Sequence, residues 1–149
     1  MSELIYGQDT GFVLFEDDVT KTLNNFRQNG KRNEAGGILI GFRRDPHLHV
    51  ISCTTPYKKD KCSRFEFLRR DPLHNLAARR YWKESKGQIY YLGDWHTHPV
   101  ATPLPSSIDH HEWRKLTKSK LGPDLLFVIV GRTKWYVQYK SQTLHLLGI

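Results

Sequence analysis

Residues 88–113 read QIYYLGDWHTHPVATPLPSSIDHHEW, and they set a strand, a proline-rich loop and a helix in one order. The segment 88–98 begins with a run of mostly aromatic and aliphatic side chains, and such a run is typical of a strand. Three prolines stiffen the loop that follows, and Ser106 or Ser107 then begins a helix that extends to about Ser119. This order brings polar residues from a strand end and a helix start to one place.

Strands and helices alternate along the rest of the chain. Short apolar runs rich in β-branched residues indicate strands, and apolar residues at helical spacing after an aspartate indicate helices. The alternation predicts a mixed α/β domain with a central sheet and helices packed on it. The expected strands cover 10–15, 35–42, 48–54, 64–68, 88–98, 124–131, 134–140 and 144–149. The other expected helices run from Asp17 or Asp18 to Gly30, with Val19, Leu23 and Phe26 on one face, and from Asp71–Pro72 to Gly87, with Leu73, Leu76, Ala77 and Tyr81 on one face.

Length and composition limit the class of protein. A chain of 149 residues predicts one domain, residues 1–149, which can bury a core without disulfide bonds or a structural metal. Cys53 and Cys62 lack CxxC spacing and are expected to be reduced. The opening segment MSELIYGQDTGF has neither the basic nor the apolar region of a signal peptide. No apolar run approaches the roughly 20 residues that span a membrane. We therefore expect a cytoplasmic protein without a membrane partner.

The chain is basic, with a formal net charge of +8. Such a charge suits nucleic acid, an acidic protein partner or simply a solvated surface. No RNP-like string or finger spacing accompanies it, and aromatic residues such as Trp135 and Tyr136 fall within apolar strand patterns. We therefore do not expect a nucleic-acid partner. The basic residues cluster at Lys58, Lys59, Lys61, Arg64, Arg69, Arg70, Arg79 and Arg80.

Three residues within 88–113 form a candidate metal site. His96 and His98 are two positions apart at the end of a strand, so both imidazoles lie on one face. Asp109 lies in the first turn of the next helix, and the stiff loop between returns the chain in a fixed geometry. Two imidazoles and one carboxylate leave a fourth tetrahedral position for water, as in catalytic zinc sites. The pattern therefore indicates a hydrolytic zinc centre.

Hydrolysis also needs a proton carrier, because an amine leaves poorly until it is protonated. Glu34 is the favoured candidate, since it begins the strand EAGGILIG, in which Gly36 and Gly37 let another chain approach closely. Glu34 could equally be a polar residue at a strand entrance. The rivals for the role are Glu66, Glu84, Glu112 and Asp94. Asp94 shares the strand face of the two histidines and has a second interpretation as a group that orients one of them.

Ser106 has two interpretations. As the residue before a helix, it satisfies a backbone donor, which is the commoner role of serine there. As a hydroxyl donor beside the metal, it would stabilise the oxyanion that forms when water attacks a carbonyl. His110 and His111 follow Asp109 on the helix, and we expect them to be exposed or to lie just behind the ligands, with a ligand role for one of them as an open alternative.

These residues together resemble the pattern of the JAMM (MPN+) metalloprotease family. That pattern is a glutamate on a strand, then His-x-His-Pro, and then Ser-x-x-Asp. Here the glutamate is Glu34, HTHP occupies residues 96–99, and Ser106 and Asp109 follow, with residues 100–105 completing the spacing without a gap. The match is tripartite and specific, and the expected order of strands and helices accounts for nearly the whole chain.

The resemblance implies a fold, a cofactor and a reaction. The fold is the JAB1/MPN domain, a cytidine-deaminase-like α/β/α sandwich around a central mixed, curved β-sheet. The cofactor is one Zn2+ per chain, held by His96, His98 and Asp109. The reaction is hydrolysis of the deubiquitinase type, with Glu34 as acid and base and Ser106 as oxyanion stabiliser. Inactive members of the family lack parts of this set, so the complete set implies an active enzyme.

The flanking residues imply a narrower group. GDWHTHP and PSSIDHHEW are most similar to bacterial JAMM proteins of CBASS anti-phage operons and integrative elements. Those proteins accompany E1/E2-like conjugating enzymes and remove the conjugates that they make. The implied substrate is therefore a ubiquitin-like protein or its conjugate. Processing the C-terminus of a ubiquitin-like or sulfur-carrier protein is a related alternative.

A ubiquitin-like tail would need a narrow groove. Residues 55–70 and 99–105 flank the motif, and we expect them to form its two walls, with Pro99, Gly36 and Gly37 beside the substrate. The tail would pair as an added strand, and the basic residues between Lys58 and Arg64 would steer an acidic partner.

Three other functions stay open on the sequence alone. The first is a catalytically inactive docking module of the MPN type, against which the intact site residues argue. The second is a nucleic-acid-associated protein, suggested by the charge. The third is a zinc amidase that acts on a small molecule, but the PCxxC string common in deaminases is absent.

Overall fold

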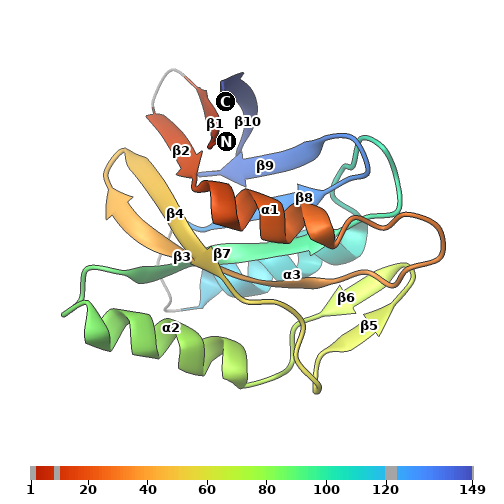
Figure 1. Ribbon diagram of the computed structural model, residues 1–149, viewed down its shortest axis with the longest axis horizontal. Coiled ribbons are helices and arrows are strands. Elements are labelled where there is room, and N and C mark those ends of the chain that lie inside the picture. The colour runs from red at the N-terminus through yellow and green to blue at the C-terminus, as the bar shows by residue number, and fades with distance from the viewer. Residues whose placement is uncertain (1–2, 9–10, 120–123, 149) are drawn as a thin grey trace.

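The structure is a computed structural model that describes residues 3–8, 11–119 and 124–148. Figure 1 shows a curved sheet with helices around it, and a small hairpin to one side. The strands are β1 (Leu4–Gln8), β2 (Gly11–Phe15), β3 (Gly36–Arg44), β4 (His47–Cys53), β5 (Lys61–Ser63), β6 (Glu66–Leu68), β7 (Tyr90–Thr97), β8 (Leu126–Val130), β9 (Trp135–Tyr139) and β10 (Gln142–Gly148). The helices are α1 (Asp17–Asn25), α2 (Leu73–Glu84) and α3 (Ser107–Lys118).

The α/β class predicted from the sequence is confirmed, but the sheet is not specifically that of a sandwich. Eight strands close into a barrel in the order β1-β10-β9-β8-β7-β3-β4-β2. The sheet is mixed, because β7 pairs in parallel with β8, and β2 with β4. Closure depends on β1, which pairs with both β2 and β10. The sequence analysis placed no strand over Leu4–Gln8, since five residues that include a glycine give a weak strand signal.

The other predicted elements are present, with ends that differ by a few residues. Thr10 and Ile149, at the outer ends of two predicted strands, lie outside the described residues. The first helix begins at Asp17, but Glu16, rather than Asp17 or Asp18 as expected, occupies the N-cap position. The two aspartates lie instead in the first turn, where their charge favours the helix dipole. This helix ends at Asn25, before the expected stop at Gly30.

Two apolar clusters hold the helices to the barrel on opposite sides of β7 and β8. One cluster contains Val19 and Leu23 of α1 together with Trp95 of β7. The other places Trp113 of α3 on Phe127 of β8, with ring centroids 4.5 Å apart. Figure 1 shows α1 in front of these strands and α3 behind them. All five residues of β8 are buried, because helices cover both of its faces.

The prediction that α2 buries an apolar face is wrong. Leu73 and Leu76 are 47% and 52% exposed, and the buried residue of this helix is His74. Hydrogen bonds, rather than an apolar stripe, hold this helix to the barrel: His74 Nδ1 lies 2.6 Å from Thr54 Oγ1, and Tyr81 donates to Ser52. Helical spacing alone does not reveal which face is buried when polar contacts provide the anchor.

The β5–β6 hairpin forms a two-stranded sheet of its own beside the barrel. The sequence analysis expected a single strand over 64–68 here, and the structure gives a short hairpin instead. Asp60 fixes both ends of the hairpin, because its carboxylate accepts bonds from the backbone of Tyr57, Arg70 and Asp71 and lies 2.6 Å from His74 Nε2. The hairpin is thus anchored at its base by one buried carboxylate.

None of the helices in the described part of the chain is long and apolar enough to span a membrane.

Candidate metal centre

The end of β7 presents the two histidines of the motif on one face. His96 is paired with Gly36 of β3 on one side and with Ile129 of β8 on the other, so the strand is held from both edges. The Nε2 atoms of His96 and His98 lie 3.1 Å apart. A strand held on both sides therefore fixes two imidazole nitrogens close enough to share one ion.

The start of α3 brings a carboxylate to the same point. Asp109 Oδ1 lies 3.1 Å from His96 Nε2, and Asp109 Oδ2 lies 3.1 Å from His98 Nε2. A reciprocal cap at Ser106 fixes the helix start: Ser106 Oγ accepts from the Asp109 N–H, and the Ser106 N–H donates to Asp109 Oδ2. The helix cap and the carboxylate position are therefore one structural feature.

The spacing of these three groups fits a tetrahedral ion. Ligand atoms about 2.0–2.1 Å from zinc in a tetrahedron are separated from one another by about 3.3 Å. The observed contacts of 3.1 Å among His96, His98 and Asp109 are close to that value. Burial alone would raise the pKa of Asp109, but hydrogen bonds with the two imidazoles outweigh burial and hold it well below its usual range. Asp109 is therefore charged at neutral pH, and two imidazoles with one carboxylate are a donor set that suits a divalent ion such as zinc.

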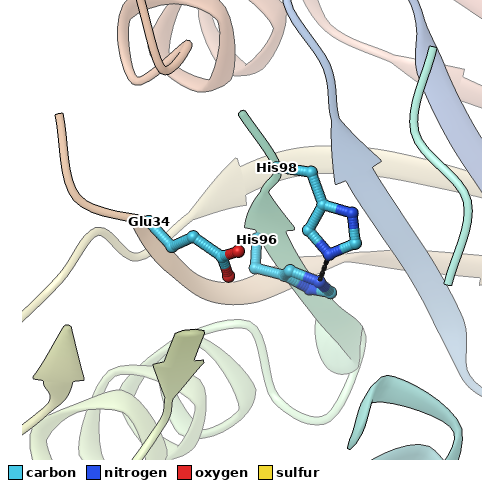
Figure 2. Close-up of side chains that lie close together, drawn as sticks. All are labelled: Glu34, His96 and His98. Carbon is cyan, nitrogen blue, oxygen red and sulfur yellow. Dashed lines mark hydrogen bonds between the residues drawn. The ribbon is translucent and has the colours of Figure 1, made fainter. Parts of the chain in front are cut away.

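Glu34 reaches the same site from the segment before β3. Its carboxylate lies within 4.8 Å of the ligand nitrogens of His96 and His98, and Figure 2 shows it pointing toward them. Its N–H donates to Ser63 of the hairpin at 2.7 Å. Glu34 groups with His96 and His98 as a possible metal-binding set, and Asp109 offers a second carboxylate with shorter contacts to the imidazoles, at 3.1 Å. Asp109 is therefore the nearer candidate for a third ligand.

The environment of Glu34 favours its protonated form. Burial raises its pKa to about 8, and the negative charges of Asp109 and Glu66 add to the effect. A carboxyl group with a pKa in this range can both accept and donate a proton near neutral pH. The arrangement is thus suited to general acid–base chemistry beside a metal.

The rival acids have other partners. Glu66 lines a hollow that Glu34 also lines, and it lies 3.5 Å from Lys61. Glu112 lies 3.2 Å from Lys115 on α3, and Glu84 lies at the end of α2, 4.0 Å from Arg80.

Asp94 is bound away from the imidazoles. Arg69 Nε donates to Asp94 Oδ2 at 2.5 Å, and the Tyr91 hydroxyl donates to Asp94 Oδ1. Among the residues that the structure describes, Asp94 makes no hydrogen bond that would orient a histidine. Sequence reasoning missed Arg69, because residues 25 positions apart carry no local signal of a pair.

Two hollows meet at the candidate centre. One, of about 300 Å³, lies between the hairpin and the loop after β7, and its lining includes Pro99, Val100 and Ser106. The other, of about 340 Å³, lies between β6, β7 and α3. Phe67, Ile108 and Asp109 line both. The expected groove walls, residues 55–70 and 99–105, thus each contribute lining residues beside the metal ligands.

The two glycines of β3 admit close neighbours, as predicted, but the neighbours come from the protein itself. A Cβ atom on Gly36 would lie 2.5 Å from the ring of Phe67, and one on Gly37 would lie 2.2 Å from the carbonyl oxygen of Thr54. The glycines therefore seat the hairpin and the end of β4 against the strand that follows Glu34.

His110 and His111 are exposed on α3. The ring of His110 packs near Trp113, with centroids 5.9 Å apart. Among the described residues, the group that could hold a metal contains neither His110 nor His111.

The fold and the site define a JAB-type domain, and the chain belongs to the family described as prokaryotic homologs of the JAB domain, which it matches over residues 17–144. The resemblance read from the motifs is thereby confirmed. The chain is similar to a CD-NTase/cGAS isopeptidase of Pseudomonas aeruginosa, with 38% identity over 122 residues, covering 78% of this chain and 77% of that protein. It is also 33% identical over 144 residues to a CD-NTase/cGAS isopeptidase of Vibrio cholerae, covering 95% of this chain and 91% of that protein.

A solved structure shares the fold. The solution structure of protein DSY2949 from Desulfitobacterium hafniense superposes with a TM-score of 0.63 at 19% identity, covering 89% of this chain and 88% of that one. At this identity the likeness shows the fold alone.

Proposed function

We propose that this chain is a zinc-dependent isopeptidase that hydrolyses the bond after the C-terminus of a ubiquitin-like modifier. One observation carries the proposal: His96, His98 and Asp109 converge with mutual contacts of 3.1 Å, and the buried carboxyl of Glu34 lies beside them. The relatives named CD-NTase/cGAS isopeptidases support the reaction class. By analogy with those names, the conjugated target is a CD-NTase-like protein.

The residues divide the reaction among them. His96, His98 and Asp109 would hold zinc, which supplies a Lewis acid for the scissile carbonyl and for water when it is bound. Glu34 accepts a proton from the attacking water and delivers it to the nitrogen of the leaving amine as the C–N bond breaks. Burial of the Glu34 carboxyl raises its pKa, which favours holding the proton between the two transfers.

Ser106 supports both the helix and the developing charge. Its oxygen accepts from the Asp109 N–H, which leaves the hydroxyl hydrogen available as a donor. Ser106 is exposed and lines the smaller hollow. We propose that the hydroxyl donates to the carbonyl oxygen as it becomes an oxyanion. The capping and catalytic interpretations of Ser106 are therefore compatible.

The modifier's tail would lie between the hairpin and the loop after β7. An extended tail can add to the hairpin as a strand, with backbone hydrogen bonds for affinity. The basic residues Lys58, Lys59 and Lys61 lie just before and at the start of β5 and are exposed, and we propose that they attract an acidic partner. We propose that the 149-residue chain works as one cytoplasmic domain that opposes an E1/E2-like conjugation system in anti-phage defence.

The test is cleavage of a lysine-linked conjugate of a ubiquitin-like protein by the purified chain. Zinc-loaded wild type is compared with zinc-loaded Glu34→Gln and with chelator-treated wild type. We expect release of free modifier by zinc-loaded wild type alone, with Glu34→Gln slower by about 10²–10⁴-fold. Equal release by Glu34→Gln would contradict the role of Glu34. No release by wild type that binds zinc would contradict the isopeptidase reaction and leave linear C-terminal extensions or small amides as substrates.

A further inference from the structure

A buried polar pair lies behind the candidate metal centre. Thr97 stands between His96 and His98 on β7, so its side chain points to the opposite face of the strand from the two imidazoles. Gln28 lies in the segment after α1. Both residues are 0% exposed, and the Thr97 hydroxyl donates to Gln28 Oε1 at 2.9 Å. Burial of this kind is uncommon for glutamine unless its polar atoms are all paired.

Thr97 binds the strand of the metal ligands to the segment that carries Glu34. The Thr97 N–H donates to the Ala35 carbonyl at 2.9 Å, and the Ala35 N–H donates to Thr97 Oγ1 at 3.0 Å. The ladder between β3 and β7 ends at Gly36 and His96, so these two bonds extend it by one further residue. Glu34 directly precedes Ala35, and its distance from the imidazoles therefore depends on this extension.

Gln28 binds the same segment to the hairpin. Its Nε2 donates to the Arg32 carbonyl at 3.0 Å and to the Arg64 carbonyl at 2.9 Å. Arg64 lies in the turn of the hairpin, next to Ser63, whose carbonyl accepts from the Glu34 N–H at 2.7 Å. One amide thus contacts the approach to Glu34 and the groove wall, while Thr97 connects that amide to the metal ligands.

The network has a single arrangement. Both carbonyls near Gln28 Nε2 can only accept, so the amide must point its nitrogen toward them and its oxygen toward Thr97. The Thr97 oxygen already accepts from the Ala35 N–H, so its hydrogen is given to Gln28. Every polar atom of the two side chains is used, and breaking one bond would leave a buried group unpaired.

We propose that Gln28 and Thr97 are positioning residues that set the metal ligands, Glu34 and the hairpin wall relative to one another. The inference rests on the proposed function, and it assigns these residues no contact with substrate or metal. It predicts that removing either hydrogen-bonding group, without changing side-chain size, disturbs the metal geometry and the reaction together.

The experiment uses two isosteric variants, Thr97→Val and Gln28→Met, and a conservative one, Thr97→Ser. Thr20→Val is the matched control, because Thr20 is also buried but its hydroxyl donates to the Glu16 carbonyl at the start of its own helix, away from the network. Each full-length protein is loaded with Co2+, and its visible absorption spectrum reports the ligand geometry. Hydrolysis of the lysine-linked conjugate by the zinc-loaded proteins gives kcat and KM at a temperature where each variant is folded.

We expect Thr97→Val to shift the cobalt spectrum and to lower kcat by about 10- to 100-fold, the cost of a small misplacement of reacting groups. Gln28→Met should lower kcat and also raise KM, because it frees the hairpin. Thr97→Ser and Thr20→Val should match wild type in both measurements. The double variant should be little worse than the worse single variant, since both remove one network.

A folded Thr97→Val protein with the wild-type cobalt spectrum and kcat would overturn the inference. If Thr97→Val does not fold, Gln28→Asn, which keeps the amide but shortens its reach, is judged by the same two measurements. A wild type that binds cobalt but cleaves no conjugate would contradict the proposed function alone, because the spectra of the variants still decide the positioning role.

Discussion

Two carboxyl groups beside the same imidazoles have pKa values shifted in opposite directions. Burial and neighbouring negative charge raise the pKa of Glu34 to about 8. Burial would raise the pKa of Asp109, but hydrogen bonds from the imidazoles and from the Ser106 N–H lower it. A ligand must be charged and a proton carrier must titrate near the working pH. The two residues therefore meet different requirements within one small site.

Asp60 has a comparable electrostatic role at the base of the hairpin. Burial would raise its pKa, but hydrogen bonds from three backbone N–H groups and from His74 outweigh it and lower the pKa below the ordinary 3.8. A carboxyl with a lowered pKa in the folded state stabilises the protein above its unfolded pKa, and the benefit is lost as the pH falls through the folded value.

Replacing Asp60 by Asn should therefore have a pH-dependent cost. At pH 7 we expect Asp60→Asn to lower the free energy of unfolding by about 1–3 kcal/mol, because an amide cannot accept all the bonds that the carboxylate accepts. The difference from wild type should shrink below pH 3.8, where the wild-type carboxylate becomes protonated. Urea unfolding at several pH values measures both. A difference that stays constant from pH 7 to pH 2 would contradict the linkage.

At the scale of elements, the sequence predicted most strands and helices and the convergence of their ends. Apolar runs located β3, β7 and β8, and the Ser106 cap located α3 to within a residue. The buried face of α2 could not be predicted, because its anchor is the polar contact of His74 with Thr54 and Asp60. Such contacts join residues far apart in the chain and leave no periodic pattern.

The close approach of the segment after β4 to β3 gives a stability prediction. A Cβ on Gly37 would lie 2.2 Å from the carbonyl oxygen of Thr54, which is backbone and cannot move aside cheaply. We expect Gly37→Ala to lower the free energy of unfolding by about 1–3 kcal/mol or more. Gly148→Ala on β10 is the control, since nothing lies within 4 Å of a Cβ there. Equal midpoints for the two variants in thermal unfolding would show that the close approach has no energetic weight.

At the scale of the whole molecule, closure of the barrel distinguishes the fold from the α/β/α sandwich that the family resemblance implied. Closure requires β1 to pair with β10, and a pairing between the two ends of the chain is invisible to local patterns. The contacts of Gln28 and Arg69 could not be predicted for the same reason, because their partners lie far away in the sequence. Thr97 lies inside the HTHP motif, so its position beside the two histidines was visible in the sequence. The candidate ligands were predictable because the family pattern is local in sequence and specific in spacing.

The distribution of charge gives a prediction about association. Lys58, Lys59 and Lys61 are exposed near the hairpin, so reversing them to Glu should slow binding of the conjugate by about tenfold or more at low salt. The difference should shrink as salt is added. The matched control reverses Arg79, Arg80 and Lys83 on α2, which changes net charge equally elsewhere. Stopped-flow binding to the Glu34→Gln background measures both, and equal slowing by the two sets would show an effect of net charge alone.

The claim on which the account depends most is that His96, His98 and Asp109 hold one zinc ion and that Glu34 does not. Native mass spectrometry of the zinc-loaded protein after removal of free metal measures this directly. We predict about one zinc per chain in wild type and in Glu34→Gln, and loss of the ion in His98→Ala and Asp109→Ala. A wild type without zinc, or a Glu34→Gln protein that loses the ion while Asp109→Ala keeps it, would contradict the assignment of the site.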